Sequence, residues 1–236
     1  MLEPLIKAIQ GAVVPEVLHN GDYWSKQVYL PPAEPEAEPI QISTLTGLVD
    51  YLKADIDAKT SDMHIEVISP TAVQICNALT GRHRQRETFL VADCRDFIGN
   101  GFPFGQWLDT EQFVIALQSQ FVQTEERDQV IAIVGSIVDQ NVRESSDDGM
   151  TQNVTTRAGI QRKEDTEVPN PITLKPYRTF PEIDQPESPF VLRLRRDRGI
   201  QAALFEAGGG AWKCEAVRAI ATYLKGRLDD SISVLA

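Results

Sequence analysis

The sequence predicts an α+β protein with mixed or antiparallel sheets. Apolar residues recur at helical spacing in some segments and alternate with polar residues in others. The two kinds of segment are interspersed, without the regular strand–helix repeat of a doubly wound fold. The 236 residues are 42% apolar and 24% charged, which is enough for a sizeable core. We expect an N-terminal segment over residues 1–42 and a single α+β domain over residues 43–236.

The N-terminal segment combines a short apolar stretch with a proline-rich one. Leu2–Val14 predicts one helix, which Pro15 ends. Pro31–Pro39 reads Pro-Pro-Ala-Glu-Pro-Glu-Ala-Glu-Pro, and such a composition favours an extended polyproline-like conformation. We interpret it as an arm that reaches a neighbouring molecule, with Pro35 and Glu36 as candidate interface residues. The alternative is a plain linker.

The next segment changes from helical to strand periodicity. Leucine and valine at helical spacing after Ser43, the expected N-cap, predict an amphipathic helix over residues 44–58. Alternation and β-branched residues then predict strands at His64–Ile68, Val73–Leu79 and Thr88–Ala92.

A helical hairpin is expected in the middle of the chain. Asp109-Thr110 opens a helix with Phe113 on its apolar face, and Thr124, followed by acidic residues, opens a second one. Their short connection makes them antiparallel neighbours.

A long β-hairpin arm is expected over residues 142–160. Asp148-Gly149 is a favoured hairpin turn, and the strand after it is rich in threonine. Threonine favours strands but buries little apolar surface, so Thr151, Thr155 and Thr156 are candidate interface residues. The alternative is an ordinary surface loop.

The C-terminal part predicts another hairpin and a final helix. Phe190–Arg195 alternates apolar with charged residues, and Ile200–Glu206 follows as its partner. Arg193, Arg195 and Arg196 are candidate interface residues for phosphates, RNA or an acidic protein surface. The alternative is an edge strand protected from aggregation by charge. Gly208–Gly210 leads into a helix up to Leu228, and its glycines are interpreted as a turn with positive φ rather than a phosphate loop.

The motifs of common enzymes and metal sites are absent from the sequence. The three histidines and three cysteines form no chelating spacing, and no nucleophile elbow is present. Asp93 and Asp96 beside Cys94 are the most plausible acidic cluster, although turn chemistry explains them equally well. We therefore expect no catalytic residues, cofactor or metal, and a non-enzymatic role is favoured over an enzymatic one.

The charge and hydropathy of the sequence argue against nucleic-acid and membrane partners. The net charge of −11 makes binding to nucleic acid unfavourable, since such binding depends on neutralising phosphates. No apolar run is long enough to span a bilayer, so no membrane partner is expected. Three widely spaced cysteines do not suggest a disulfide framework, and the cytosol is the simplest compartment.

Several short pieces follow one another in a characteristic order along the chain: Thr44–Leu52, Leu108–Phe113, the hairpin to Ile160, Pro171–Tyr177, Phe180–Ile183 and Phe190–Arg195. In the order of these pieces, residues 43–206 resemble the YfdQ-like family of phage and prophage proteins. The resemblance supplies no catalytic residues, and it does not extend to the Pro/Glu segment or to Gly208–Leu228. The resemblance implies a phage-encoded accessory protein in the cytoplasm of a bacterial host.

Two functional hypotheses follow. In the first, the chain is a non-enzymatic accessory protein that assembles with itself, with other phage or host proteins as further partners. Copies tied by arms would then form a homo-oligomer, with a closed shell as the boldest version. In the second, the chain binds or processes nucleotides or nucleic acid in the infected host, through Arg193, Arg195 and Arg196.

Overall fold

The fold is described from a computed structural model of the chain. The described residues are 16–17, 23–24, 37–57, 63–79, 86–138, 141–147, 152–157, 163–168, 170–196 and 199–236. The chain divides into two compact units, Met1–Ala37 and Glu38–Ala236. In the first, β1 (Glu16–Val17) pairs antiparallel with β2 (Tyr23–Trp24). The predicted helix over Leu2–Val14 and the predicted arm as far as Glu36 lie outside the described residues.

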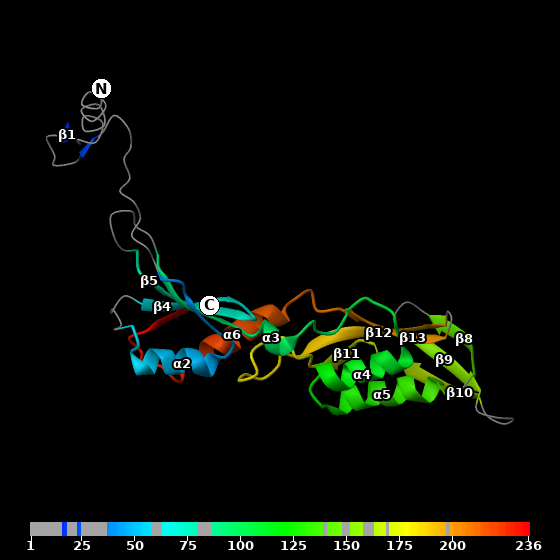
Figure 1. Cartoon of the computed structure of the whole chain (residues 1–236). Coiled ribbons are helices and arrows are strands. Elements are labelled where there is room, and N and C mark those ends of the chain that lie inside the picture. Colours follow the sequence, from blue (N-terminus) through cyan, green and yellow to red (C-terminus); the bar gives the residue numbers. More distant parts are fainter. Residues whose placement is uncertain are drawn as a thin grey trace, which may run out of the picture. The chain divides into compact units, whose positions relative to one another are not determined.

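The second unit contains a mixed five-stranded sheet, of which Figure 1 labels β4 and β5. Its strand order is β14-β4-β5-β6-β3. Its centre is an antiparallel meander, and parallel strands lie at both edges. The strands are β3 (Ile40–Ile42), β4 (Met63–Ser69), β5 (Ala72–Asn77), β6 (Thr88–Asp93) and β14 (Ser233–Leu235). The structure confirms the three predicted central strands, whereas the two short edge strands were not predicted. Since β3 pairs with β6, residues 40–42 belong to the second unit and not to the N-terminal segment.

Two helices cover one face of this sheet. Helices α2 (Leu45–Ala54) and α6 (Trp212–Lys225) lie on the same side of β4 and β5 (Figure 1). Their leucines and isoleucine pack on alternate residues of the strands, such as Ile65 and Ile75, in a first hydrophobic core. The N-cap of α2 is Thr44, whose hydroxyl accepts from the Gly47 amide at 3.1 Å, one residue after the predicted Ser43.

A four-stranded antiparallel sheet with the order β11-β12-β13-β7 has a core of its own. The strands are β7 (Leu108–Asp109), β11 (Ile172–Leu174), β12 (Ser188–Arg196) and β13 (Ile200–Glu206). Phe190, Leu192 and Leu194 on one face of β12 are buried, as the alternation predicted. They pack with residues of the helical hairpin in a second hydrophobic core.

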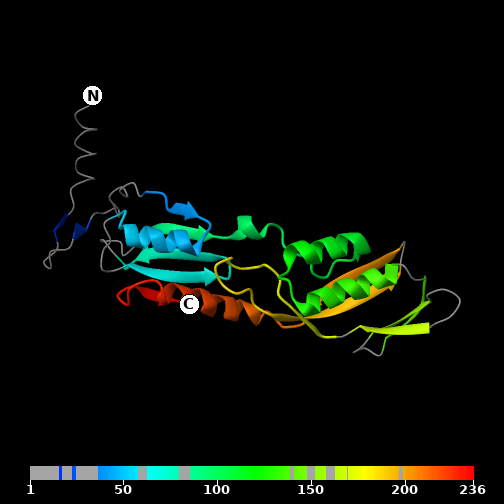
Figure 2. The same ribbon diagram turned by 90° about the horizontal axis from the view of Figure 1, so that it is seen from below.

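The predicted helical hairpin consists of α4 (Thr110–Gln120) and α5 (Glu125–Val138), seen beside β11 and β12 in Figure 2. The Asp109 carboxylate accepts from the Gln112 amide at 2.8 Å and caps α4. The Thr124 hydroxyl accepts from the Arg127 amide at 3.2 Å at the start of α5. Both helix starts match the sequence prediction, because side-chain capping is encoded locally.

The predicted β-hairpin is part of a three-stranded antiparallel sheet with the order β10-β9-β8. β8 (Asn141–Asp147) and β9 (Gln152–Arg157) are its two arms, and β10 (Lys163–Val168) adds a strand that was not predicted. Together these elements, with the short helix α3 (Arg95–Ile98), make an α+β fold with a C-terminal helix, which confirms the predicted class. Among the described residues, no helix combines the length and apolar character needed to cross a membrane.

Candidate functional site

Strand β12 presents arginines on the sheet face that points away from its core. Val191, Arg193 and Arg195 alternate with the buried residues of the strand, so they occupy the opposite face. Arg196, the third predicted arginine, has the parity of the inner face and lies exposed at the strand end opposite Ile200. The structure therefore places two of the three predicted arginines on one surface.

Two aromatic residues, Trp107 and Phe205, lie on the same face as these arginines. The guanidinium carbon of Arg195 lies 4.3 Å from the centre of the Trp107 ring, a cation–π contact. Its Nε also donates to the Gln201 side chain on β13 at 2.8 Å. The Trp107 and Phe205 rings meet edge to face with their centres 6.2 Å apart, and Phe205 remains 36% exposed. We call Trp107, Val191, Arg193, Arg195, Gln201 and Phe205 the Arg–Trp surface.

Arg193 lies in the middle of this surface. It faces Ala203 across the strand pair, and Ala203 is fully buried. Its Nη1 atom is buried and has no hydrogen-bond partner among the described residues. A buried donor without an acceptor is costly, by about 1–3 kcal/mol, more for a charged group. Because this atom is buried, an acceptor from another molecule could reach it only after the side chain moved, and a partner would contact the part-exposed remainder of Arg193.

The sequence did not indicate the two aromatic residues as part of the site. Trp107 precedes β7, and the pairing of β7 with β13 brings it beside Arg195, 88 residues later by their numbers. Phe205 lies opposite Val191 on β13. The alternation of β12 was the available signal for the face, but nothing local in the sequence shows which loop lies against it.

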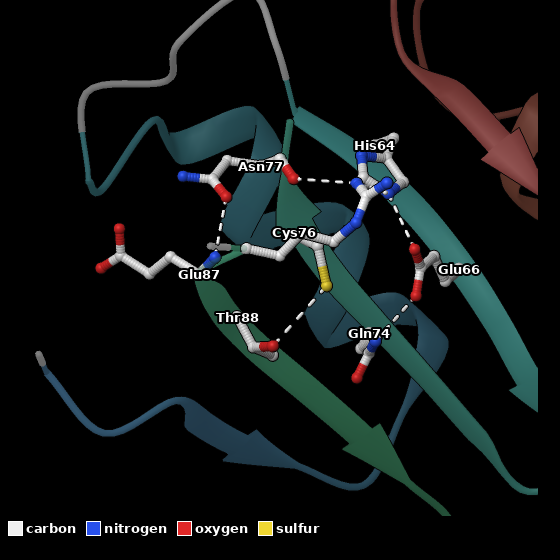
Figure 3. A network of polar contacts seen from close by, with 8 residues as sticks. His64, Glu66, Gln74, Cys76, Asn77, Glu87 and Thr88 are labelled. Atoms are coloured by element: carbon white, nitrogen blue, oxygen red, sulfur yellow. Dashed lines mark hydrogen bonds and ion pairs between the residues drawn. The ribbon is translucent and has the colours of Figure 1, made fainter. Parts of the chain in front are cut away.

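The five-stranded sheet also has a face away from its helices, and a polar network covers it (Figure 3). Glu66 on β4 interacts with His64 Nε2 at 2.9 Å and accepts from the Gln74 amide at 2.8 Å. Arg86 donates to the Asn77 carbonyl at 3.3 Å, and its Nη1 lies 3.4 Å from His64 Nε2.

The network also includes contacts between β5 and the start of β6. The Asn77 side-chain oxygen accepts from the Glu87 amide at 2.8 Å, and Cys76 Sγ lies 3.6 Å from the Thr88 hydroxyl (Figure 3). The hydrogen bonds from His64 and Gln74 hold the pKa of Glu66 below its ordinary value, against a small opposing effect of burial. Burial raises the pKa of the Cys76 thiol, which is therefore a poor nucleophile.

The acidic cluster around Cys94 is explained by a local ion pair. Arg95 donates through Nε to the Asp93 carboxylate at 2.8 Å, and this pairing lowers the pKa of Asp93. Cys94 is fully buried, and that burial raises the pKa of its thiol to about 12. Within the described part of the chain, no three His, Cys, Asp or Glu side chains come together as a metal site.

Arg178 is a buried cation that the sequence did not indicate. It is 8% exposed, forms an ion pair with Glu206 at 2.9 Å and donates to the Ser188 hydroxyl. Its guanidinium carbon lies 3.8 Å from the centre of the Trp212 ring at the start of α6. Burial lowers its pKa to about 10, although Glu206 opposes the shift. Both terminal nitrogens of Arg178 have partners in the chain itself, although its Nε has none among the described residues, and we assign the residue a structural role.

The remaining predicted interface residues are three that the structure does not describe and two on β9. Pro35, Glu36 and Thr151 are outside the described residues. Thr155 and Thr156 lie on β9, the central strand of the three-stranded sheet, opposite Asp165 and Glu164 of β10. They are therefore not on the strands that carry the Arg–Trp surface.

The Gly208–Gly210 turn has the backbone conformation that the sequence predicted. Gly209 and Gly210 have φ of 58° and 79°, the left-handed region that favours glycine. At Gly208 a Cβ would lie 3.1 Å from the Pro189 ring.

Comparisons with protein-family models, with curated proteins and with solved structures found no match to this chain.

Proposed function

We propose that the protein is a non-enzymatic accessory protein that assembles into a homo-oligomer through the Arg–Trp surface. The observation that carries this proposal is Arg195 stacked on Trp107, beside Phe205, which is 36% exposed, and the part-exposed Arg193. Helices α4 and α5 pack on the opposite face of the same sheet. The surface therefore offers apolar area and hydrogen-bond donors to a partner.

Its composition is that of a protein-binding surface. Tryptophan and arginine are enriched among the residues that dominate binding energy at protein interfaces. The Arg195 side chain is held by Trp107 and Gln201 before any partner arrives, which lowers the entropy cost of binding. A surface that binds a different surface of the next copy generates a ring, a filament or, with further contacts, a shell.

A nucleic acid is the alternative partner, because an arginine stacked on tryptophan also resembles a platform for a base. The net charge of −11 opposes this choice. We therefore favour a protein partner, and nucleic-acid binding is a contrary outcome of the test below.

The biological setting is proposed from the resemblance of residues 43–206 to the YfdQ-like family. On that basis the protein is phage- or prophage-encoded and acts in the cytoplasm of the bacterial host, with other phage or host proteins as further partners. The resemblance adds no catalytic residue, which agrees with an accessory role.

The test is the native mass by light scattering across a range of protein concentrations. We expect an oligomer, and we expect Arg193→Glu/Arg195→Glu to weaken self-association at least about tenfold. The matched control is Arg218→Glu/Lys225→Glu, which makes the same charge change on exposed positions of α6 and should leave the mass unchanged. A monomeric parent protein, or tight salt-sensitive binding of single-stranded DNA that the Arg193/Arg195 change abolishes, would refute the proposal.

A further inference from the structure

We infer that the Arg–Trp surface of one copy binds the Pro/Glu segment, residues 31–39, of a second copy. This inference rests on the proposed self-assembly and names the partner segment. The segment contributes Glu34, Glu36 and Glu38 among four prolines, and the surface contributes two arginines and two aromatic rings. The carboxylates of the segment are complementary to the arginines of the surface, and its prolines are complementary to the aromatic rings.

The charges are complementary. Carboxylates form strong, charge-assisted hydrogen bonds with arginine. Arg193 is part-exposed, and Arg195, two residues further on the same face, is exposed. In a strand these two Cα atoms are about 6.6 Å apart. Glutamates two residues apart in a polyproline II helix are separated along its axis by about 6.2 Å. The rises along the two backbones are therefore similar, and because the two glutamates point about 120° apart around the helix, their side chains have to turn toward the arginines.

The prolines suit the aromatic part of the surface. Pro32-Ala-Glu-Pro35 has the Pro-x-x-Pro spacing, and in a polyproline II helix of three residues per turn its two prolines share one face. Aromatic grooves bind such segments at low entropy cost, because the prolines already restrict the backbone. Trp107 and Phe205, in edge-to-face contact, offer adjoining rings to the proline face. Glu34 and Glu36 then flank that face and can reach the guanidinium groups.

The position of the segment in the chain favours binding to a second copy. Pro39 directly precedes β3, which pairs with β6 in the five-stranded sheet. The Arg–Trp surface lies on the four-stranded sheet, which has a different core. The segment is thus attached at one sheet and complementary to the other. Pairing an acidic segment with a basic surface also offsets the repulsion between two chains that each carry −11.

The test uses two full-length charge-reversal variants. The segment variant is Glu34→Lys/Glu36→Lys, and the surface variant is Arg193→Glu/Arg195→Glu. We expect each variant alone to raise the dissociation constant for self-association at least about tenfold in sedimentation experiments. Asp229→Lys/Asp230→Lys is the matched control for the segment variant, because it reverses two exposed acidic residues elsewhere, and it should assemble normally.

Mixing the two variants gives the decisive result. The intact surface of the segment variant meets the intact segment of the surface variant, and the reversed segment and the reversed surface attract each other as well. The mixture should therefore assemble with the two variants in alternation. Combining all four substitutions in one chain should restore assembly to within about threefold of the parent protein, because the reversed charges attract again. If the surface variant fails to fold, as judged by circular dichroism, Trp107→Ala takes its place in the mixture.

The outcomes separate this inference from the proposed function. If the surface variant loses assembly while the segment variant assembles like the parent, the segment is not the partner and self-assembly through the surface stands. If both variants weaken assembly but their mixture forms no complex, binding between copies is refuted. A parent protein that stays monomeric refutes the inference and the proposed function together.

Discussion

The two sheets of the second unit each have one face that their helices leave uncovered. The two faces differ in the contacts that their polar side chains make. On the five-stranded sheet, Glu66 is hydrogen-bonded to two neighbours, and the network continues through Arg86 to Asn77. On the four-stranded sheet, Arg195 stacks on Trp107, and Nη1 of Arg193 is buried without a hydrogen-bond partner among the described residues. The polar groups of the first face pair with one another, whereas the second is the face that we propose binds a partner.

This difference is our reason for proposing one sheet face, and not the other, as a binding surface. Both faces follow the same alternation and both carry arginine, so polarity alone does not separate them. The polar network satisfies its groups internally, and a ligand would have to break those bonds to bind. The Arg–Trp surface combines exposed aromatic area at Phe205 with the exposed arginine Arg195, so a partner there would add contacts without breaking a network of this kind.

The largest effects on stability are expected from core residues that lie beneath the two faces. Truncating such a residue should destabilise the protein equally under either face. Ile75 under the network and Leu192 under the Arg–Trp surface are fully buried in different cores. Ile75→Ala and Leu192→Ala should each lower the free energy of unfolding by about 2–5 kcal/mol in urea denaturation. The effects should add in the double variant, since the sites share no neighbours. The exposed Ile115→Ala is the control, and a core variant that matches it would contradict the packing described here.

The next effect should appear at one face only. Trp107→Ala removes the ring that holds Arg195, and it should weaken self-association about 30-fold, as expected for a residue worth about 2 kcal/mol at an interface. His64→Ala on the other face should leave self-association unchanged. Sedimentation of both variants checks this, and an equal effect of the two changes would break the distinction between the faces.

A smaller effect tests the closed network through pH. The pKa of Glu66 is below its ordinary value in the folded protein, chiefly through the hydrogen bond with His64. The stability that this carboxylate contributes is therefore present above its unfolded pKa of about 4.3 and is lost as the pH falls through the folded pKa. Glu66→Gln should cost about 0.5–1 kcal/mol at pH 7, and the difference from the parent should shrink at lower pH.

Urea denaturation of Glu66→Gln at pH 7 and at pH 3 measures this effect, with Asp230→Asn as an exposed control. A difference from the parent that grows on acidification would show that the sign of the coupling is wrong.

The mildest test uses the cysteines as reporters. Cys214 is exposed, whereas Cys76 and Cys94 are buried with thiol pKa values raised by burial. A thiol reagent at pH 8 should modify Cys214 in the folded protein and the other two cysteines only in denaturant. Mass spectrometry of the modified peptides checks the order, and early labelling of Cys76 would indicate that the network opens.

Much of the fold could be predicted because long elements carry their signal locally. The caps at Asp109 and Thr124 and the alternation of Phe190–Arg195 are all properties of neighbouring residues. The strands β3, β11 and β14 span three residues each, which is too short for a period to show. The N-cap of α2 was wrong by one residue because Ser43 and Thr44 are both good caps.

The candidate site could be predicted only in part. Arg193 and Arg195 follow from the period of one strand, but Trp107 reaches them through the pairing of β7 with β13. The network likewise depends on which strands are neighbours, since His64 lies opposite Cys76 only in the observed register. Contacts between distant segments are set by tertiary packing, and a single strand's pattern does not contain them.

The most direct test of the central claim compares the two faces in one sample. Hydroxyl-radical footprinting measures the oxidation of Trp107 and Phe205 on the Arg–Trp surface and of His64 on the network, at dilute and at concentrated protein. Exposed Phe97 serves as the internal reference. We predict that Trp107 and Phe205 become protected at the higher concentration while His64 and Phe97 keep their oxidation rates. Unchanged oxidation of Trp107 and Phe205, or equal protection of His64, would contradict the assignment of the Arg–Trp surface as the interface.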